Sequence, residues 1–341
     1  MKPTPIVSGL TAGANDRLIS VEVTDHEGTH SDTATIVLDD RDGILALPQK
    51  GQVFTVSLGY RETGVELMGE YTVNDVTLEG YPQKIKVQGK SADMGKSKLK
   101  EPRSKHHEKK TIGQIVGEAA ARAGVVPMVG PELGNFVYNS LHQTDESDMS
   151  LLSRLAHDHD ATFTVKNGRM IFMPKEGGFS VTGLAMGAAF IRGPGSFIGV
   201  LPAANIPGDV IKYDCTLPDR PKHSQIKVGW WDTAKAKLMV EQAQSGSDGP
   251  TFFDRHHAPN QKEAQARAKG RGKRMKREQG HLRVEVVGDP SLRAEMLAIV
   301  TGIRAGVDGP WRVKSATHHV EEKGYTCSLD CELPGSGAAS Q

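Results

Sequence analysis

Alternation of apolar and polar residues with a period of two is the feature that most constrains the fold of this chain. In residues 17–25, Ile19, Val21 and Val23 fall on one side of an extended chain, and the residues between them are polar. The same alternation returns in residues 34–38, 54–60 and 84–88. Strands this close in sequence favour an antiparallel barrel or sandwich. The 38 glycines fit many short strands joined by turns.

Length and pattern shifts divide the chain into several units. A chain of 341 residues is expected to form two or three domains, at roughly 100 to 200 residues each. We predict a first β domain at 1–95, a linker and small α/β insert at 96–175, a connection at 176–208, a second β domain with one helix at 209–335, and a disordered tail at 336–341.

The boundary near residue 96 is drawn from composition. Residues 96–110 read KSKLKEPRSKHHEKK, a basic stretch without a periodic apolar face. Such a stretch is typical of an exposed linker. Residues 176–208 are rich in Gly, Ala and Pro, and their weak periodicity indicates a connection without a derivable path.

Two helices and a hairpin are predicted in the insert. Thr111 can cap a helix that carries an apolar stripe and ends at Gly124. Ser147 or Asp148 can cap a second helix. A hairpin is expected about the Asn-Gly pair at residue 167.

Charge and composition disfavour several classes of protein. The 42 Lys and Arg residues nearly balance the 41 Asp and Glu residues, which is not the charge of a dedicated nucleic-acid binder. No stretch approaches the roughly 20 apolar residues of a membrane span, and the N-terminus has no apolar signal core. The three cysteines show no disulfide framework. We therefore expect a protein made in a cytoplasm with reduced thiols and no membrane partner.

Catalytic, metal and cofactor residues are not predicted. Histidines are paired at His106/His107, His157/His159, His256/His257 and His318/His319. Adjacent residues of a strand face opposite ways, and residues two apart on a helix point about 200° apart, so these pairs are poor metal sites. GPGSFIG at 193–199 is too irregular for a dinucleotide fingerprint, and no nucleophile elbow or phosphate loop is present.

The last predicted strand carries two of the cysteines. Cys327 and Cys331 fall on one face of it, roughly 13 Å apart, which is too far for a disulfide. We therefore expect both thiols to pack in a core.

Candidate contact residues lie in the last third of the chain. In QIKVGWWD, Trp230 shares the apolar face of a strand, so Trp231 falls on the polar face. Trp231 is a candidate contact with a neighbouring subunit or another protein, and the alternative is burial under a helix or loop. Residues 262–277 form a basic helix that includes Arg271 and Arg274. This helix can be a solvated face, a contact with an acidic neighbouring subunit, or a DNA-binding surface. If it is a subunit contact, Arg271 and Arg274 are the candidate contact residues.

Three blocks carry a resemblance to a known family. They are KSKLKEPRSKHHEKKTIGQIVGEAAARAGV, QTDESDMSLLSRLAHDHDATFTVKNGRMIF, and the late NQKEAQARAKGRGKRMKREQGHLRVEVVGDPSLRAEMLAIVTG with its ending GPWRVKSATHHVEEKGYTCSLDCEL. In these blocks and in the order of its elements, the chain resembles the late control protein D family, the baseplate hubs of contractile phage tails and tail-like particles.

The resemblance implies a fold class and a role. The fold would be mainly β with an α+β insert: two barrel-like antiparallel β domains plus a small α/β region. Three chains would form a homotrimeric ring that joins the tail tube to the central spike, with other baseplate proteins as further partners and DNA only as cargo of the channel. The protein would then be a structural part of the virion tail, assembled in the host cytoplasm. The competing hypotheses are a DNA-binding regulator that uses residues 262–277 and a cell-wall-degrading enzyme.

Overall fold

The structure is a computed structural model, and it describes residues 1–28, 30–91, 97–166, 168–175, 188–194, 197–198, 201–202, 208–217, 223–245 and 249–335. The predicted mainly β character is confirmed, because strands dominate these ranges. The predicted tail at 336–341 and most of the predicted connection at 176–208 lie outside the described residues. In the described part, no helix has the length and hydropathy needed to cross a membrane.

The first β unit follows from the alternating pattern. In its third strand, Ala34, Ile36 and Leu38 are fully buried, while the residues between them are half-exposed. These strands enclose a core with Phe54 and Tyr71, whose rings lie 5.7 Å apart. The elements are β1 (Ile6–Ser8), the short helix η1 (Ala14–Arg17), β2 (Leu18–His26), β3 (Thr33–Asp39), β4 (Val53–Tyr60), β5 (Gly64–Glu79) and β6 (Lys84–Ser91).

The α/β unit follows in the chain, and its predicted helix caps are confirmed. The Thr111 hydroxyl accepts the Gln114 N–H at 3.1 Å, and Gly124 ends this helix at a φ of 67°. The Ser147 hydroxyl accepts the Ser150 N–H at 3.1 Å. The elements are η3 (Ser97–Leu99), β7 (Pro102–Thr111), α1 (Ile112–Ala123), β8 (Val126–Val129), α2 (Pro131–Gly134), β9 (Val137–Ser147), α3 (Asp148–His159), β10 (Ala161–Lys166) and β11 (Arg169–Pro174).

The basic stretch at 96–110 is not the exposed linker that we predicted. Most of it forms β7, which pairs with β9 in a two-stranded antiparallel ribbon. Lys105 and Lys110 of β7 pair with Glu118 of α1, Arg103 lies 3.6 Å from Asp148, and the one fully buried side chain of this strand is His107. A ribbon that buries so little of this strand leaves no apolar alternation in the sequence to indicate it.

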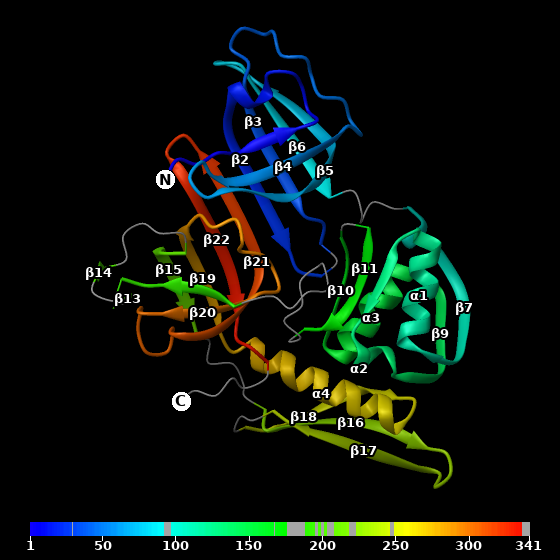
Figure 1. Cartoon of the computed structure of the whole chain (residues 1–341). Coiled ribbons are helices and arrows are strands. Elements are labelled where there is room, and N and C mark those ends of the chain that lie inside the picture. The colour runs from blue at the N-terminus through cyan, green and yellow to red at the C-terminus, as the bar shows by residue number, and fades with distance from the viewer. Residues whose placement is uncertain are drawn as a thin grey trace.

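The remaining chain forms a second β unit and a helix-backed sheet. The second β unit contains β12 (Ala189–Arg192), β15 (Val210–Thr216), β19 (His281–Val287), β20 (Leu297–Thr301), β21 (Gly309–Glu321) and β22 (Gly324–Glu332), with the short pair β13 (Phe197–Ile198) and β14 (Leu201–Pro202). The helix-backed sheet contains β16 (Gln225–Asp232), β17 (Lys237–Gln244), β18 (Thr251–Ala258) and α4 (Gln261–Arg277). Figure 1 shows this sheet at the end of the molecule opposite β2–β6, with α4 between it and the α/β unit.

The two β units share one sheet, which corrects the expectation of two separate barrel-like domains. Among the described residues, this sheet has twelve strands, and its main path runs β1-β4-β5-β6-β3-β2-β21-β22-β19-β15. β2 pairs with β3 on one edge and with β21 on the other, so the first unit continues into the second and neither closes on itself as a barrel. The strands β16–β18, predicted within the second β domain, form a sheet of their own.

Candidate assembly surfaces

The junction between the two β units is a continuous strand pairing. β2 and β21 pair antiparallel from Ser20 opposite Glu321 to His26 opposite Ser315. The cores also run together, because Val320 and Tyr325 of the second unit are buried in the core of the first. The Tyr60 hydroxyl donates to the Gly288 carbonyl at 2.7 Å across this junction. The two units therefore form one continuous sheet.

The two β units repeat one strand order. In the first unit the pairings are β2-β3, β3-β6, β6-β5, β5-β4 and β4-β1, and in the second they are β15-β19, β19-β22, β22-β21, β21-β20 and β20-β12. Each strand of the first unit therefore has a counterpart at the same place in the chain order of the second. One pairing differs in direction: β1 is antiparallel to β4, whereas β12 is parallel to β20.

One face of the shared sheet is polar across the junction. Register partners on seven successive strands form a row of polar side chains: Lys212, Glu285, Ser328, Thr317, Thr24, Thr33 and Lys90. The Thr24 and Thr317 hydroxyls lie 3.2 Å apart where the two units meet. The strands of the second unit leave a depression of about 570 Å³ on this face. This polar face contains both acidic and basic side chains.

A buried lysine ties the α/β unit to the first β unit. The Lys166 ammonium lies 2.5 Å from an Asp25 carboxylate oxygen and 2.9 Å from an Asp32 oxygen. Burial, together with the neighbouring Asp25 carboxylate, raises the pKa of Asp32 to about 7 against the pull of Lys166. Burial would lower the pKa of Lys166, but the two carboxylates outweigh it and the pKa is raised. Lys166 is therefore held as a cation between them.

A chain of ion pairs connects the other units. Arg277 of α4 donates to Asp160 at the end of α3, at 2.9 Å, and its Nε lies 3.3 Å from Glu332 of β22. Arg312 of β21 lies 3.0 Å from the same Glu332 oxygen and also donates to Glu27. Both guanidinium groups are almost fully buried, so each relies on its carboxylates for its stability in the fold. The sequence alone did not predict these ion pairs, because the partners are far apart along the chain.

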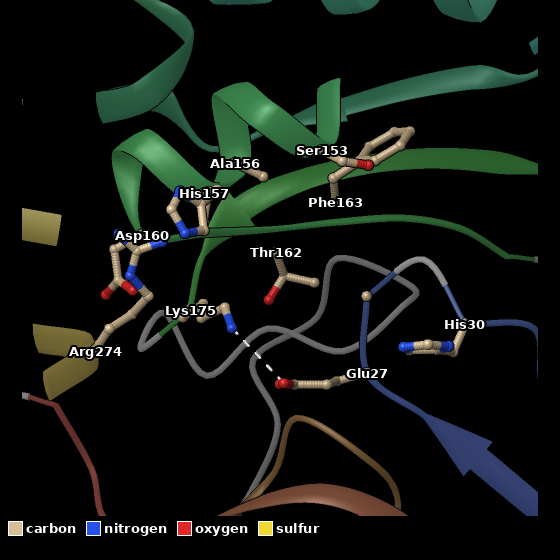
Figure 2. A pocket seen from close by; sticks show the side chains of 12 residues that line it. Glu27, His30, Ser153, Ala156, His157, Asp160, Thr162, Phe163, Lys175 and Arg274 are labelled. Atoms are coloured by element: carbon tan, nitrogen blue, oxygen red, sulfur yellow. Dashed lines mark ion pairs between the residues drawn. The ribbon is translucent and has the colours of Figure 1, made fainter. Parts of the chain in front are cut away.

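A polar cavity of about 230 Å³ lies where these units meet. Figure 2 shows Lys175 pointing toward Glu27, at 3.7 Å, with Thr162, His157 and Arg274 around the opening. In its wall, Glu27 pairs with Lys175, and Asp160 is bound by Arg277. The cavity is a gap between packed units, and it offers no arrangement of a nucleophile and a base among its lining residues.

Trp231 lies on the outer face of the helix-backed sheet. Trp230 packs with Ile226 and Val228 against α4, as the alternation predicts. Trp231 is 52% exposed, and described residues do not cover it with a helix or loop. Its neighbours on this outer face include three more exposed apolar side chains, Leu238, Val240 and Phe253. The four apolar residues form the outer apolar patch.

Arg271 and Arg274 lie on the other side of this sheet, so the structure does not bring them together with Trp231. The Arg271 guanidinium stacks 4.3 Å from the Phe252 ring centre and lies 3.1 Å from Asp254. Arg274 is half-buried at the polar cavity, and burial lowers its pKa. Arg267 is also paired, with Asp158 at 3.2 Å. Much of the basic helix is thus neutralised within the chain, which argues against the DNA-binding hypothesis.

The histidine and cysteine residues of the last strands serve packing. His318 is fully buried; its Nε2 donates to the Leu292 carbonyl at 2.9 Å, and its Nδ1 accepts from the Tyr325 hydroxyl at 2.7 Å. Burial lowers its pKa to about 4, so it is neutral at neutral pH. Cys327 and Cys331 are free, fully buried thiols in the core of the second unit, as predicted.

Comparison with known proteins identifies the family. No protein-family model matches the chain. The chain is 25% identical over 353 residues to the probable baseplate hub protein of Escherichia phage 186, which covers 95% of this chain and 90% of that protein. The chain belongs to the family of phage baseplate hub proteins.

A second relative supports this assignment, and a solved structure shares the fold. The chain is 32% identical over 174 residues to the probable baseplate hub protein of Escherichia phage P2, over 51% of this chain and 45% of that protein. Its fold is that of the 43 kDa tail protein of prophage MuSo2 from Shewanella oneidensis, with a TM-score of 0.71, 13% identity, and coverage of 98% and 99%. As a hub protein, the chain is a structural component of the virion baseplate and not an enzyme.

Proposed function

We propose that this hub protein assembles as a homotrimeric ring in the baseplate of a contractile phage tail, joining the tail tube to the central spike. The repeated strand order of the two β units supports this proposal, since three chains would then present six equivalent units. Each unit would face the sixfold tube, and the polar face of the shared sheet would line the channel through which DNA passes.

The mass of the assembly in solution tests the ring. We expect light scattering of the purified full chain to give about 110 kDa, three times the 36.8 kDa of one chain. The measurement is made on the protein alone and again with a spike protein from the same tail. A strict monomer of the single-chain mass in both samples would contradict the trimer.

We further propose that the outer apolar patch around Trp231 contacts another tail protein. The patch lies on the helix-backed sheet, at the end of the molecule away from the first β unit (Figure 1). Exposed aromatic residues are enriched in protein interfaces and often dominate their binding energy. Arg271 and Arg274 would support this contact from behind, Arg271 by holding Phe252 and Asp254 of β18 in place.

Trp231→Ala is expected to weaken binding without unfolding the chain. Because the side chain is 52% exposed, the free energy of unfolding should change by less than about 0.5 kcal/mol. Loss of a central aromatic contact should cost about 2 kcal/mol of binding, or roughly thirty-fold in Kd. Titration against baseplate partners measures this change in Kd, with Val126→Ala, at a 61% exposed position on the α/β unit, as the control. An unchanged Kd for every baseplate partner would remove Trp231 from the interface.

A further inference from the structure

The counterpart strands of the two β units match residue by residue. β5 has a bulge between Val73 and Asp75 opposite β6, and β21 has one between Val313 and Ser315 opposite β22. β2 has a bulge after Leu18 opposite β3, and β15 has one after Val210 opposite β19. Bulges are specific features of a strand, so they fix which residues correspond.

The two units differ in what lies beside these strands. The second half of β21, from Ser315 to Glu321, pairs with β2. Its counterpart in β5, Asp75–Glu79, pairs with β6 on one edge, and no described strand pairs with its other edge. β15, the counterpart of β2, likewise pairs only with β19 among the described strands. One chain therefore has both halves of a second junction, at two separate edges.

We propose that β15 of one copy pairs antiparallel with Asp75–Glu79 of β5 in a second copy, which repeats the β2–β21 junction between chains. The proposal rests on the trimeric ring and specifies its contact. Val23 of β2 lies opposite His318 of β21. Aligning the bulges makes Cys215 the counterpart of Val23 and Leu78 the counterpart of His318. Cys215 of one copy therefore lies opposite Leu78 of the next.

Exposure of apolar side chains at both edges supports this pairing. At the internal junction, Val21 and Val23 are buried in the core of the first unit, at 0% and 1% exposure. Tyr213, the counterpart of Val21, is 43% exposed, and Leu217, just beyond the end of β15, is 56% exposed. Leu78 is 54% exposed, although its counterpart His318 is fully buried.

An edge strand with unpaired backbone groups and exposed apolar side chains is a template for strand addition. A second copy covers both edges at once, because each copy has one edge of each kind. Such a contact is heterologous, and heterologous contacts close into rings when the rotation between copies allows it. The same sheet would then run through the whole ring.

The register also predicts one unfavourable pair. In the internal junction, Glu22 lies opposite His319, and their side chains approach to 3.7 Å. Their counterparts between copies are Asp214 and Glu79, two carboxylates facing each other. Like charges directly opposite on a sheet weaken the pairing. Glu79→Lys is therefore expected to strengthen association several-fold, whereas Glu66→Lys, in the half of β5 that already pairs with β4, should not.

Disulfide cross-linking of the full chain tests the register. Opposed residues of antiparallel strands have Cα atoms about 4.5–5.5 Å apart, within the range of a disulfide. In Leu78→Cys, the introduced thiol should meet the native Cys215 of the next copy. Diamide oxidation should convert most of this variant to covalent dimers and trimers on a non-reducing gel. Leu67→Cys, 62% exposed on the other half of the same strand, should stay monomeric on the gel.

Combining Leu78→Cys with Cys215→Ser should abolish the cross-link. A cross-link that persists in this double variant, or its absence in Leu78→Cys while light scattering shows a trimer, would overturn the edge pairing and leave the trimer intact. A monomer by scattering with no cross-link would overturn both proposals. If Glu79→Lys associates no more tightly than the unmodified chain, the proposed register is contradicted.

Discussion

Lys166→Met is expected to lower the free energy of unfolding by about 3–5 kcal/mol at pH 8. The Lys166 ammonium is buried between Asp25 and Asp32, and it also donates to the His26 carbonyl at 2.9 Å. Removing the cation leaves two buried carboxylates without their counter-charge, close to the half-buried Glu295. Leaving a buried charge without its partner destabilises the fold more than the intact pair stabilises it. The unfolding free energy lost in Lys166→Met should therefore exceed the loss from breaking a surface ion pair.

The pH dependence separates this electrostatic cause from simple loss of packing. Without Lys166, Asp25 and Asp32 should hold their protons to a higher pH in the folded chain than in the unfolded chain. The folded state then binds more protons, so stability falls as pH rises above about 4. The defect should therefore be larger at pH 8 than at pH 5. Urea denaturation followed by circular dichroism measures both values.

Lys175→Met is the matched control for this experiment. Lys175 belongs to the same unit and pairs with Glu27 at 3.7 Å, but its side chain is 23% exposed. Removal of the Lys175 ammonium should lower the free energy of unfolding by about 1 kcal/mol or less. Equal losses for the two lysines, or a Lys166→Met defect that does not change with pH, would contradict the role of Lys166 as the counter-charge between units.

Local patterns predicted the elements whose side chains alternate between core and solvent. The alternation in β2, β3, β4 and β6 marked strands whose apolar residues are buried. It also placed Trp231 on the exposed face of β16 and Trp230 on the opposite face, against α4. The caps at Thr111 and Ser147 depend on residues three positions away, so the sequence contains the whole signal.

Features that depend on distant pairing were not predictable. β2 and β21 are separated by nearly the whole chain, and nothing in either strand specifies the other, so one shared sheet was read as two units. Lys166 and Arg277 look like ordinary surface cations, because their carboxylate partners belong to other units. Arg271 and Arg274 share the basic helix with Arg267, and only the packed structure shows how much of that charge is used internally.

The symmetry of the strand order has a similar explanation. The two β units have no evident sequence repeat, since a sheet requires only that apolar residues alternate and that bulges fall in the same place. Tyr71 and Trp311 are counterparts by the bulge alignment, and both are large aromatic residues with 2% exposure. Conservation of position without conservation of residue is expected where packing volume, and not chemistry, is the constraint.

Trp311→Ala is expected to cost about 3–5 kcal/mol of unfolding free energy. The indole fills the core of the second β unit, and its N–H donates to the Val307 carbonyl at 2.7 Å, which fixes the turn between β20 and β21. Trp311→Phe keeps most of the volume but leaves that carbonyl without its donor, so it should cost about 1–3 kcal/mol. Trp231→Ala, at an exposed position, is the control, and its unfolding free energy should change by less than about 0.5 kcal/mol. Urea titrations of the three variants should therefore rank Trp311→Ala, Trp311→Phe and Trp231→Ala in falling order of lost unfolding free energy. Any other order would contradict the placement of Trp311 in the core and of Trp231 on the exposed surface.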